Sequence, residues 1–468
     1  MRSAGHFGRI TRAASRRGRN QDKKGSLPDI DRIADKKLAA HVLDGGRLRA
    51  LVLELWQRTR MDWGFVTDRL ATTFRKETWI GAHERRFVGE TLYGLVRHLR
   101  RIDTALARGR KTSRAPRDLE RLLALLVLEQ LIPPARAATV IGELDWNAVA
   151  ASDEAIAHER KLATRIGLSA SLPDWLADRL VADWGDQAEA LALALNQRAP
   201  MTVRANLLIG DRDALAAELG RAHLTTRPGA WCDTALHVES RTNLFALDAF
   251  RRGAMEAQDE GSQLLADLAV AGGGKLVIDL CAGAGGKTLA IAARLGNHGR
   301  IIASDVDDGK LEELRRRARR AQVSSAQPMH LDGGRWPPAL DALRGKADVV
   351  FVDAPCSGIG ALRRNPEARW RLREADLATF AARQKQILGE ARALVAPGGR
   401  LVYATCTLLA VENADVVAAI TSPQFVAVPL ADLLGDRAHD LGDGTAFTVT
   451  PHRHGTDGFY AQVLRRIS

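Results

Sequence analysis

From Lys275 to the C-terminus, short apolar runs typical of β-strands alternate with helical segments. The strand-like runs cover residues 276–280, 300–304, 328–331, 347–352 and 400–404. Before the last run, an apolar stripe at helical spacing covers residues 374–395 and stops at Pro397-Gly398-Gly399. This alternation predicts an α/β domain with a doubly wound parallel sheet, in which ligands bind at the carboxyl edge of the strands.

A glycine loop, Asp279-Leu-Cys-Ala-Gly-Ala-Gly-Gly-Lys-Thr288, follows the first of these strands. A phosphate-binding P-loop needs glycine where Cys281 stands, and a dinucleotide fingerprint needs a third glycine where Thr288 stands. With these two loop types excluded, the remaining ligand is a nucleoside without a pyrophosphate, and S-adenosylmethionine is the common ligand of this kind. Two acids support this cofactor, because Asp305 can accept ribose hydroxyls and Asp332 could reach the adenine edge.

The chain has four cysteines, and no two have the Cys-x-x-Cys spacing of a metal site or a redox pair. An isolated cysteine near a strand is usually an inert core residue, and we interpret Cys232 and Cys281 in this way. Cys356 and Cys406 differ because each follows a predicted strand end in a polar segment. Both are therefore expected at the carboxyl edge, which predicts a methyl-transferring enzyme with two thiols in its pocket and no metal.

The balance of charges indicates a polyanionic partner. Sixty-eight Lys and Arg residues against 56 Asp and Glu residues give a net charge of +12, which favours nucleic acid. Charge alone does not separate RNA from DNA or from a membrane surface. No apolar stretch approaches the roughly 20 residues that span a bilayer, and the N-terminus lacks a signal-peptide core. We therefore expect a soluble, cytoplasmic protein without a membrane partner.

Changes of pattern divide the 468 residues into four regions. Residues 1–35 predict a flexible basic arm, with an organelle transit peptide as the alternative interpretation. Residues 36–165 have helical periodicity throughout and predict an all-α domain. Residues 166–265 combine helical and strand patterns, as in a small α+β connecting module, and residues 266–468 form the catalytic α/β domain.

Two basic runs lie in the helical region. Cations interleave with apolar residues at helical spacing from His83 to Arg101, and a second run extends from Arg108 to Arg117. A solvated face of an ordinary helix bundle explains this pattern, and so does a surface that contacts the RNA backbone.

Several motifs are more specific than these patterns. They are Asp353-Ala-Pro-Cys-Ser-Gly358, Arg363-Arg-Asn-Pro-Glu367 with Trp370, Thr405-Cys406, Gln258-Asp-Glu-Gly-Ser-Gln263 and Gly455-Thr-Asp-Gly-Phe459. Through them the chain, from about residue 36 to 467, resembles the RNA 5-methylcytosine methyltransferases of the Nol/Nop/Sun type. Within this family it is similar to the bacterial small-subunit ribosomal RNA methyltransferase B proteins. The segment from Arg85 to Arg97 is similar to the NusB-like RNA-binding domain of that subgroup.

This resemblance implies a class I S-adenosylmethionine-dependent methyltransferase fold, Rossmann-like, behind an all-α NusB-like domain and a connecting module that recognises RNA. It implies methylation of carbon 5 of a cytosine in RNA, with 16S ribosomal RNA as the expected substrate, through a covalent cysteine–cytosine intermediate. The alternatives are the same chemistry on transfer RNA and a non-catalytic RNA-binding assembly factor. The resemblance also suggests a monomer.

The resemblance assigns the attacking thiol to Cys406, help with elimination to Cys356, and hydrogen bonding to ring nitrogen 3 to Asp353. Sequence logic alone leaves the opposite assignment of the thiols open, because DNA cytosine methyltransferases attack with the Pro-Cys thiol. The expected cofactor site comprises Cys281, Ala282, Gly283, Ala284, Gly285, Gly286, Lys287, Asp305, Asp332 and Asp353.

The glycine loop departs from the resembled family at one point. The family's loop usually reads Ala-Pro-Gly-Gly, whereas this chain has Gly283-Ala-Gly-Gly286. Because proline restricts the backbone, we expect its loss to make the loop more flexible.

Overall fold

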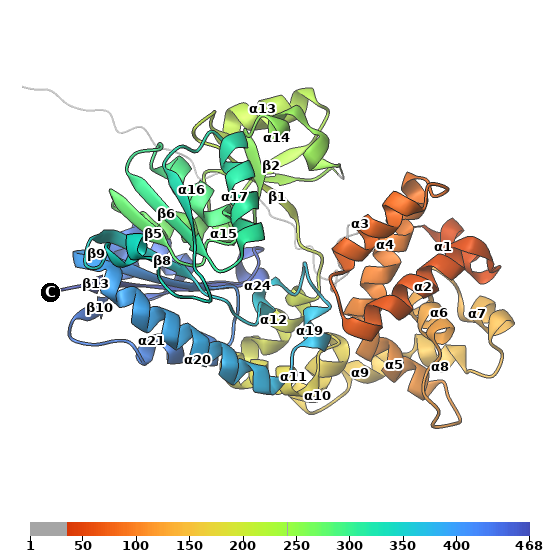
Figure 1. Ribbon diagram of the computed structural model, residues 1–468. Coiled ribbons are helices and arrows are strands. Elements are labelled where there is room, and N and C mark those ends of the chain that lie inside the picture. Colours follow the sequence, from red (N-terminus) through yellow and green to blue (C-terminus); the bar gives the residue numbers. More distant parts are fainter. Residues whose placement is uncertain (1–34, 241) are drawn as a thin grey trace, which may run out of the picture. The chain divides into compact units, whose positions relative to one another are not determined.

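The computed structural model of the chain describes residues 35–240 and 242–468 (Figure 1). The basic arm predicted for residues 1–35 lies outside the described residues except for Asp35. Among the described helices, none is long and apolar enough to cross a membrane.

From residue 35 to 200, the structure is helical. The helices are α1 (Lys36–Leu43), α2 (Gly46–Asp62), α3 (Val66–Lys76), α4 (Ala82–Arg97), α5 (Leu99–Arg108), α6 (Asp118–Leu128), α7 (Pro134–Val140), α8 (Trp146–Ala150), α9 (Ser152–Ala157), α10 (Leu162–Ser169), α11 (Asp174–Trp184) and α12 (Ala188–Leu195). Residues 122–128 of α6 are all buried, so this helix forms the centre of the core. One face of α2 is buried too, for example at Leu51 and Leu55, in line with the helical periodicity of this region. The expectation of an all-α N-terminal region is confirmed.

A small antiparallel sheet follows the helices. It contains β1 (Met201–Ala205), β2 (Thr226–Pro228), β3 (Ala235–Val238) and β4 (Met255–Ala257) in the order β2-β3-β1-β4, with α13 (Arg212–Arg221) and α14 (Asp248–Arg251) beside it. The predicted boundaries after residues 165 and 265 both fall inside helices, in α10 and in α15 (Glu260–Ala269) respectively. Helical packing thus continues across each of them.

The catalytic half is built on one large sheet. Its strands are β5 (Leu276–Asp279), β6 (Arg300–Asp305), β7 (Ala326–His330), β8 (Ala347–Asp353), β9 (Val395–Thr405), β10 (Phe425–Ala427), β11 (Gly442–Asp443), β12 (Ala446–Val449) and β13 (Phe459–Arg466). Strands β7-β6-β5-β8-β9 are parallel neighbours in that order, as predicted. Helices pack on both faces of these strands (Figure 1), with α15 and α16 (Gly286–Arg294) on one face and α20 (Glu374–Ala391) and α21 (Ala414–Ala418) on the other.

Antiparallel strands, which the sequence pattern did not predict, extend the predicted parallel sheet on one side. β13 pairs with β9 in antiparallel fashion, and β12, β11 and β10 extend the sheet with further antiparallel pairs. The link from β12 to β13 covers only residues 450–458, which is too short for the crossover that a parallel pair needs. The predicted helix 374–395 also ends earlier, because β9 starts at Val395, ahead of Pro397-Gly398-Gly399.

Candidate active site

The two cysteines singled out from the sequence meet at the carboxyl edge of the sheet. β8 ends at Asp353 and its parallel neighbour β9 ends at Thr405, with Asp353 paired to Ala404. Each strand leads into a short polar segment that carries one cysteine. The Sγ atoms of Cys356 and Cys406 lie 3.4 Å apart, and both residues are partly exposed.

Lys287 reaches the same point from the glycine loop. It lies in the first turn of α16, and its Nζ donates to Asp353 Oδ2 over 2.6 Å. The ammonium also lies 5.7 Å from the centre of the Phe459 ring. Burial acts to lower the pKa of Lys287, but Asp353 outweighs it and the net shift is upward, so this residue stays cationic. Lys287 was predicted as a cofactor ligand, and in the structure it is paired with Asp353, the carboxylate predicted to act on the base.

The two thiols have opposite electrostatic environments. The hydrogen bond from Cys356 lowers the pKa of Cys406, and the Lys287 cation adds to this effect against burial and Asp353. The pKa of Cys356 is raised well above its usual range by the same hydrogen bond, by burial and by the nearby carboxylate of Glu412. Cys406 therefore ionises first, and Cys356 remains the thiol that donates to it.

Asp305, the predicted ribose ligand, anchors the glycine loop. At the end of β6, its Oδ2 accepts from the Gly283 N–H over 2.8 Å, and its Oδ1 accepts from the Asp307 N–H over 2.9 Å. The Ala282 N–H donates to the Ser304 carbonyl over 2.9 Å, which ties the loop to β6 a second time.

Asp279 and Cys281 stand at the start of this loop. Asp279 Oδ2 accepts from the Thr288 hydroxyl over 2.7 Å, while its buried Oδ1 has no hydrogen-bond partner among the described residues. Burial raises the pKa of Asp279 to about 7. Burial also raises the pKa of the Cys281 thiol, so this cysteine stays protonated at neutral pH.

The loop leaves room for a nucleoside. A Cβ added at Gly283 would meet no atom within 4 Å, and one at Gly286 would meet only the end of Arg317, at 4.0 Å. Together with the Asp305 carboxylate and the start of α16, this open space fits the predicted S-adenosylmethionine. The remaining predicted adenine contact, Asp332, follows β7 with an exposed side chain, so its role stays a prediction.

Two residues that support the cysteines were missed in the sequence. Glu412 is fully buried, and its Oε2 accepts from the Ser357 N–H over 2.9 Å and from Gln384 over 3.0 Å. Asn413 accepts from the Thr405 hydroxyl over 2.6 Å and donates to the Thr407 carbonyl over 3.1 Å. An acid and an amide side by side within an apolar stretch was the available signal, and it is a weak one.

A close approach of two glycines completes the cysteine loops. The Gly360 N–H donates to the Cys406 carbonyl and the Gly458 N–H donates to the Gly360 carbonyl, both over 2.9 Å. A Cβ at Gly360 would overlap the Gly458 carbonyl oxygen and lie 2.8 Å from the Cys406 carbonyl oxygen. Only glycine lets the segment after Cys356, the segment after β9 and the start of β13 meet here.

The C-terminal end of the motif from Arg363 to Trp370 makes a contact with the helical region. The Trp370 Nε1 donates to the Val96 carbonyl over 2.7 Å. The fully buried Arg369 donates to the Ala170 carbonyl over 3.0 Å and to Asn196 Oδ1 over 2.9 Å. These residues join the catalytic domain to the helices before it.

The remaining motifs meet at Arg364. Its guanidinium donates to Asp259 over 2.9 Å and also to Asp457. Asp259 belongs to the motif Gln258–Gln263 and Asp457 to the motif Gly455–Phe459, so the Arg364 cation joins these two motifs. Burial and the neighbouring Asp259 raise the pKa of Asp457 to about 6. Asp457 directly precedes Gly458, which places this ionic cluster next to the Cys406 loop.

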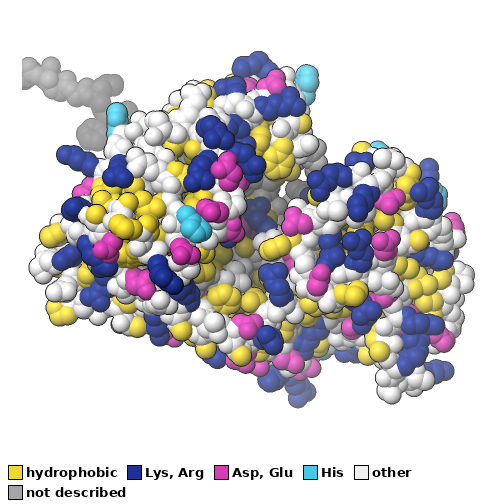
Figure 2. Space-filling view, viewed as in Figure 1, with side chains coloured by type: hydrophobic (Ala, Val, Ile, Leu, Met, Phe, Trp, Pro, Cys, Tyr) yellow, Lys and Arg dark blue, Asp and Glu magenta, His cyan; other side chains and the backbone are white. Residues whose placement is uncertain are grey.

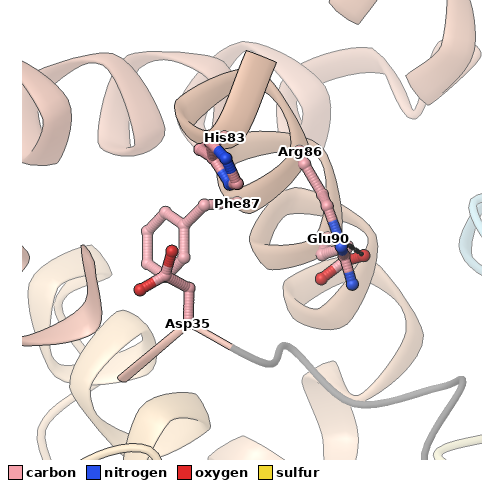
Figure 3. A pocket seen from close by; sticks show the side chains of 5 residues that line it. All are labelled: Asp35, His83, Arg86, Phe87 and Glu90. Carbon is pink, nitrogen blue, oxygen red and sulfur yellow. Dashed lines mark hydrogen bonds and ion pairs between the residues drawn. The ribbon is translucent and has the colours of Figure 1, made fainter. Parts of the chain in front are cut away.

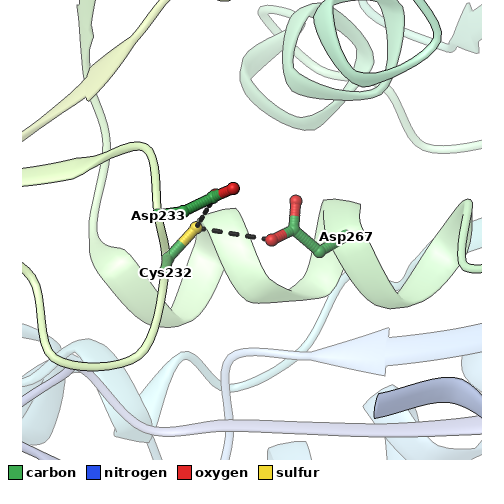
Figure 4. A group of neighbouring side chains, drawn as sticks. All are labelled: Cys232, Asp233 and Asp267. Atoms are coloured by element: carbon green, nitrogen blue, oxygen red, sulfur yellow. Dashed lines mark hydrogen bonds between the residues drawn. The ribbon is translucent and has the colours of Figure 1, made fainter. Parts of the chain in front are cut away.

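Cys232, Asp233 and Asp267 form a second cluster (Figure 4), in which atoms able to bind a metal lie within 4.8 Å of one another. Arg294 neutralises this group, with its Nε 2.6 Å from Asp267 and its Nη2 3.6 Å from the Cys232 Sγ. Burial raises the pKa of Cys232 to about 12. The guanidinium takes the position a metal cation would need, so we interpret the cluster as an internal ion pair.

A small cavity of about 130 Å³ lies in the helical region (Figure 3). Asp35 and residues of α4 line it, with the Phe87 ring at its wall and Arg86 turned toward Glu90. None of the predicted site residues lies there, and its volume is too small for a nucleoside.

The second basic run is largely engaged within the protein. Arg110, Arg114 and Arg117 surround Glu120, which is fully buried. Burial acts to raise the pKa of Glu120, but the hydrogen bonds from Arg114 and Arg117 lower it to about 2. The second run therefore stabilises the helical region, whether or not RNA also contacts it.

On the surface over α17 (Asp308–Arg320), Lys and Arg side chains lie with Asp and Glu side chains among them (Figure 2).

Known proteins resemble this chain in sequence and in fold. Residues 268–465 match the family 16S rRNA methyltransferase RsmB/F, and residues 172–244 match the RsmF/B-like ferredoxin-like domain. The solved structure of PH0851 superposes on this chain with a TM-score of 0.71 and 24% identity. The match covers 89% of this chain and 97% of the PH0851 chain. That likeness supports the Rossmann-like methyltransferase fold.

Two curated relatives carry the comparison further. A probable ribosomal RNA small subunit methyltransferase B from Synechocystis is 28% identical over 423 residues, which is 82% of this chain and 91% of the relative. The ribosomal RNA small subunit methyltransferase B of Shewanella oneidensis is 31% identical over 301 residues, which is 64% of this chain and 68% of the relative. The protein belongs to the RsmB/F family of 16S rRNA methyltransferases.

Proposed function

We propose that the protein methylates carbon 5 of a cytosine in 16S ribosomal RNA, through a covalent bond between Cys406 and the base. The observation that carries this proposal is the pair of thiols 3.4 Å apart, next to the Lys287–Asp353 ion pair at the carboxyl edge of the sheet. S-adenosylmethionine, when bound, supplies a methyl group on a positively charged sulfur. The glycine loop and Asp305 would hold it.

The first step is attack by the thiolate. Carbon 5 of cytosine is a poor nucleophile, so the Cys406 Sγ adds to carbon 6 and pushes an electron pair toward ring nitrogen 3. The lowered pKa of Cys406 supports this assignment, because the thiolate is the attacking species. Asp353, hydrogen-bonded to the Lys287 ammonium, can relay a proton from that ammonium to ring nitrogen 3. Carbon 5 then has the electron density to accept the methyl group.

The second step releases the product. A solvent water molecule takes the proton from carbon 5, the double bond between carbons 5 and 6 forms again, and the Cys406 Sγ departs as a thiolate. The proton on ring nitrogen 3 returns through Asp353 to Lys287, which restores the ammonium. Cys356 keeps its proton because its pKa is raised, so it can donate a hydrogen bond to the departing thiolate. A variant without this donor should release the RNA slowly.

The choice of RNA as substrate has two supports. The net charge of +12 suits a polyanion, and the family match is to ribosomal RNA methyltransferases. The target base must leave its stack to reach a thiol at the sheet edge, as in other enzymes that act on bases.

The test compares the wild type with Cys356→Ala, Cys406→Ala and, as a matched control, Cys232→Ala. Each is incubated with labelled S-adenosylmethionine and either small-subunit ribosomal RNA or transfer RNA. Methyl transfer and denaturation-resistant protein–RNA adducts are then measured. We expect methylation of ribosomal RNA by the wild type and the control, an adduct that accumulates in Cys356→Ala, and neither product in Cys406→Ala.

Three results would contradict the proposal. An adduct in Cys406→Ala but not in Cys356→Ala would make Cys356 the nucleophile. Methylation of transfer RNA alone would change the substrate. An inactive wild type on both RNAs would favour a non-catalytic RNA-binding factor.

A further inference from the structure

We infer that Arg317 is a positioning residue for the cofactor, because it holds the glycine loop in its binding shape from outside the loop. The inference rests on the proposed binding of S-adenosylmethionine at this loop. It concerns a residue of α17 that lies outside every motif found in the sequence.

The loop needs such a support. Gly283 and Gly285 both have left-handed backbone conformations, with φ of +53° and +84°. Glycine loses more backbone freedom than any other residue when it is ordered, so a loop with two such positions is costly to fix. Ala284 stands between them, at the position where the expected loop has proline.

Arg317 contacts the loop at this position. Its Nη1 donates to the Ala284 carbonyl over 2.8 Å. The bonds of Gly283 and Ala282 to β6 hold the front of the loop, and the Gly285 N–H bonds back to the Ala282 carbonyl over 2.9 Å. The Arg317 bond thus fixes the Ala284–Gly285 peptide, the second of the two peptides between the left-handed glycines, and it can supply the stiffness that proline would give.

Arg317 is itself oriented by the connecting sheet. Its Nη2 donates to Glu256 Oε2 over 3.1 Å, and Glu256 belongs to β4, where its side chain is almost completely buried. The planar fork of a guanidinium can serve a carbonyl and a carboxylate at the same time, which a single ammonium cannot do in this geometry. The connecting module is therefore tied to the cofactor loop through one side chain.

Arg320 provides a matched control. It lies one turn further along α17, pairs with Glu256 Oε1, and its guanidinium lies 3.9 Å from the centre of the Phe250 ring. It makes no described contact with the loop. A variant of Arg320 loses the same ionic partner as a variant of Arg317 and leaves the loop bond intact.

The experiment uses the full chain and two readouts. Isothermal titration calorimetry measures the affinity for S-adenosylhomocysteine, the stable product of the cofactor. Hydrogen exchange of the loop amides is measured on the ligand-free protein. Arg317→Met should weaken binding about tenfold, the loss expected for one hydrogen bond from a charged donor, and should speed exchange at Gly285. Arg317→Lys should not restore either property, and Arg320→Met should change neither.

A rescue separates loop stiffness from other effects. The Ala284 N–H bonds to no described residue and its φ is not positive, so neither a lost hydrogen bond nor a left-handed backbone opposes proline at this position. Adding Ala284→Pro to Arg317→Met should restore most of the affinity, because both changes act on the backbone of residue 284.

The outcomes are decisive in both directions. Unchanged binding and exchange in Arg317→Met, equal losses in Arg320→Met, or a failed rescue would each overturn the role of Arg317. If the wild type itself does not bind S-adenosylhomocysteine, the proposed cofactor is wrong. Exchange in the ligand-free loop would still decide whether Arg317 holds it.

Discussion

Removal of the Cys356 thiol should move the ionisation of Cys406 to higher pH. In the structure the Cys356 S–H is the first cause of the lowered pKa of Cys406, across a sulfur–sulfur distance of 3.4 Å. A hydrogen bond to a charged acceptor contributes about 1.5 kcal/mol at the low end of its range, which suits a weak S–H donor. Since one pKa unit corresponds to about 1.4 kcal/mol, Cys356→Ala should raise the midpoint by about one unit.

The direction of the pKa shift follows from which form of Cys406 the hydrogen bond stabilises. The hydrogen bond favours the thiolate, so its loss lowers the thiolate fraction at any pH below the new midpoint. At a pH well below both midpoints, the thiolate fraction should fall about tenfold for a shift of one unit. Cys356→Ser keeps a hydroxyl donor and should stay close to the wild type. The adduct assay with Cys356→Ala therefore belongs in alkaline buffer.

The assay is alkylation of the RNA-free protein with iodoacetamide from pH 6 to pH 10, followed by mass spectrometry of the peptide that contains Cys406. The thiols of Cys232, which is buried, and of Cys281, which is partly exposed, should react far more slowly, because desolvation raises the pKa of each. A midpoint in Cys356→Ala equal to or below that of the wild type would refute the reasoning. So would a shift of the same size in Cys356→Ser.

Three further predictions address the frame around the thiols. Gly360→Ala should abolish methylation in the methyl-transfer assay, because its Cβ would overlap a carbonyl oxygen of the facing loop. The control Gly389→Ala should be neutral in the same assay, because a Cβ at that position meets nothing within 4 Å. Arg369→Met should destabilise the protein by about 2 kcal/mol, because it leaves buried carbonyls without a donor, whereas the exposed Arg373→Met should leave thermal unfolding unchanged. Mild peroxide should link the two active-site thiols as a disulfide that dithiothreitol reverses, and non-reducing peptide mass spectrometry should find no such link in Cys356→Ala.

The parallel core of the sheet was predictable because apolar runs and helices alternate there with regular spacing. β13 escaped prediction. Its sequence, Phe459-Tyr-Ala-Gln-Val-Leu-Arg-Arg466, is buried on both faces for most of its length, and such a run lacks the alternation that marks a strand. Its antiparallel pairing with β9 depends on contacts between residues far apart in the chain. Local patterns carry no information on such pairing.

The reactive groups of the site were predictable, and their supports were not. The two cysteines follow neighbouring strands, and Asp353 is the last residue of one of these strands, so a predicted sheet was enough to bring Cys356, Cys406 and Asp353 together. Glu412 and Arg317 act through hydrogen bonds to backbone atoms on other elements. The Ser357 N–H and the Ala284 carbonyl are backbone groups, which have no side-chain signature, so no specific motif in the sequence indicated either contact.

The contact between Trp370 and the helical region has a consequence for truncated forms of the chain. The segment that follows Cys356 continues directly into residues that bond to carbonyls in α4 and just after α10. A chain without the helical region would leave the Trp370 indole and the Arg369 guanidinium facing water, a few residues beyond the reactive loop. We therefore expect that the α/β domain produced alone would lose order in this segment, next to the cysteine on which its chemistry depends.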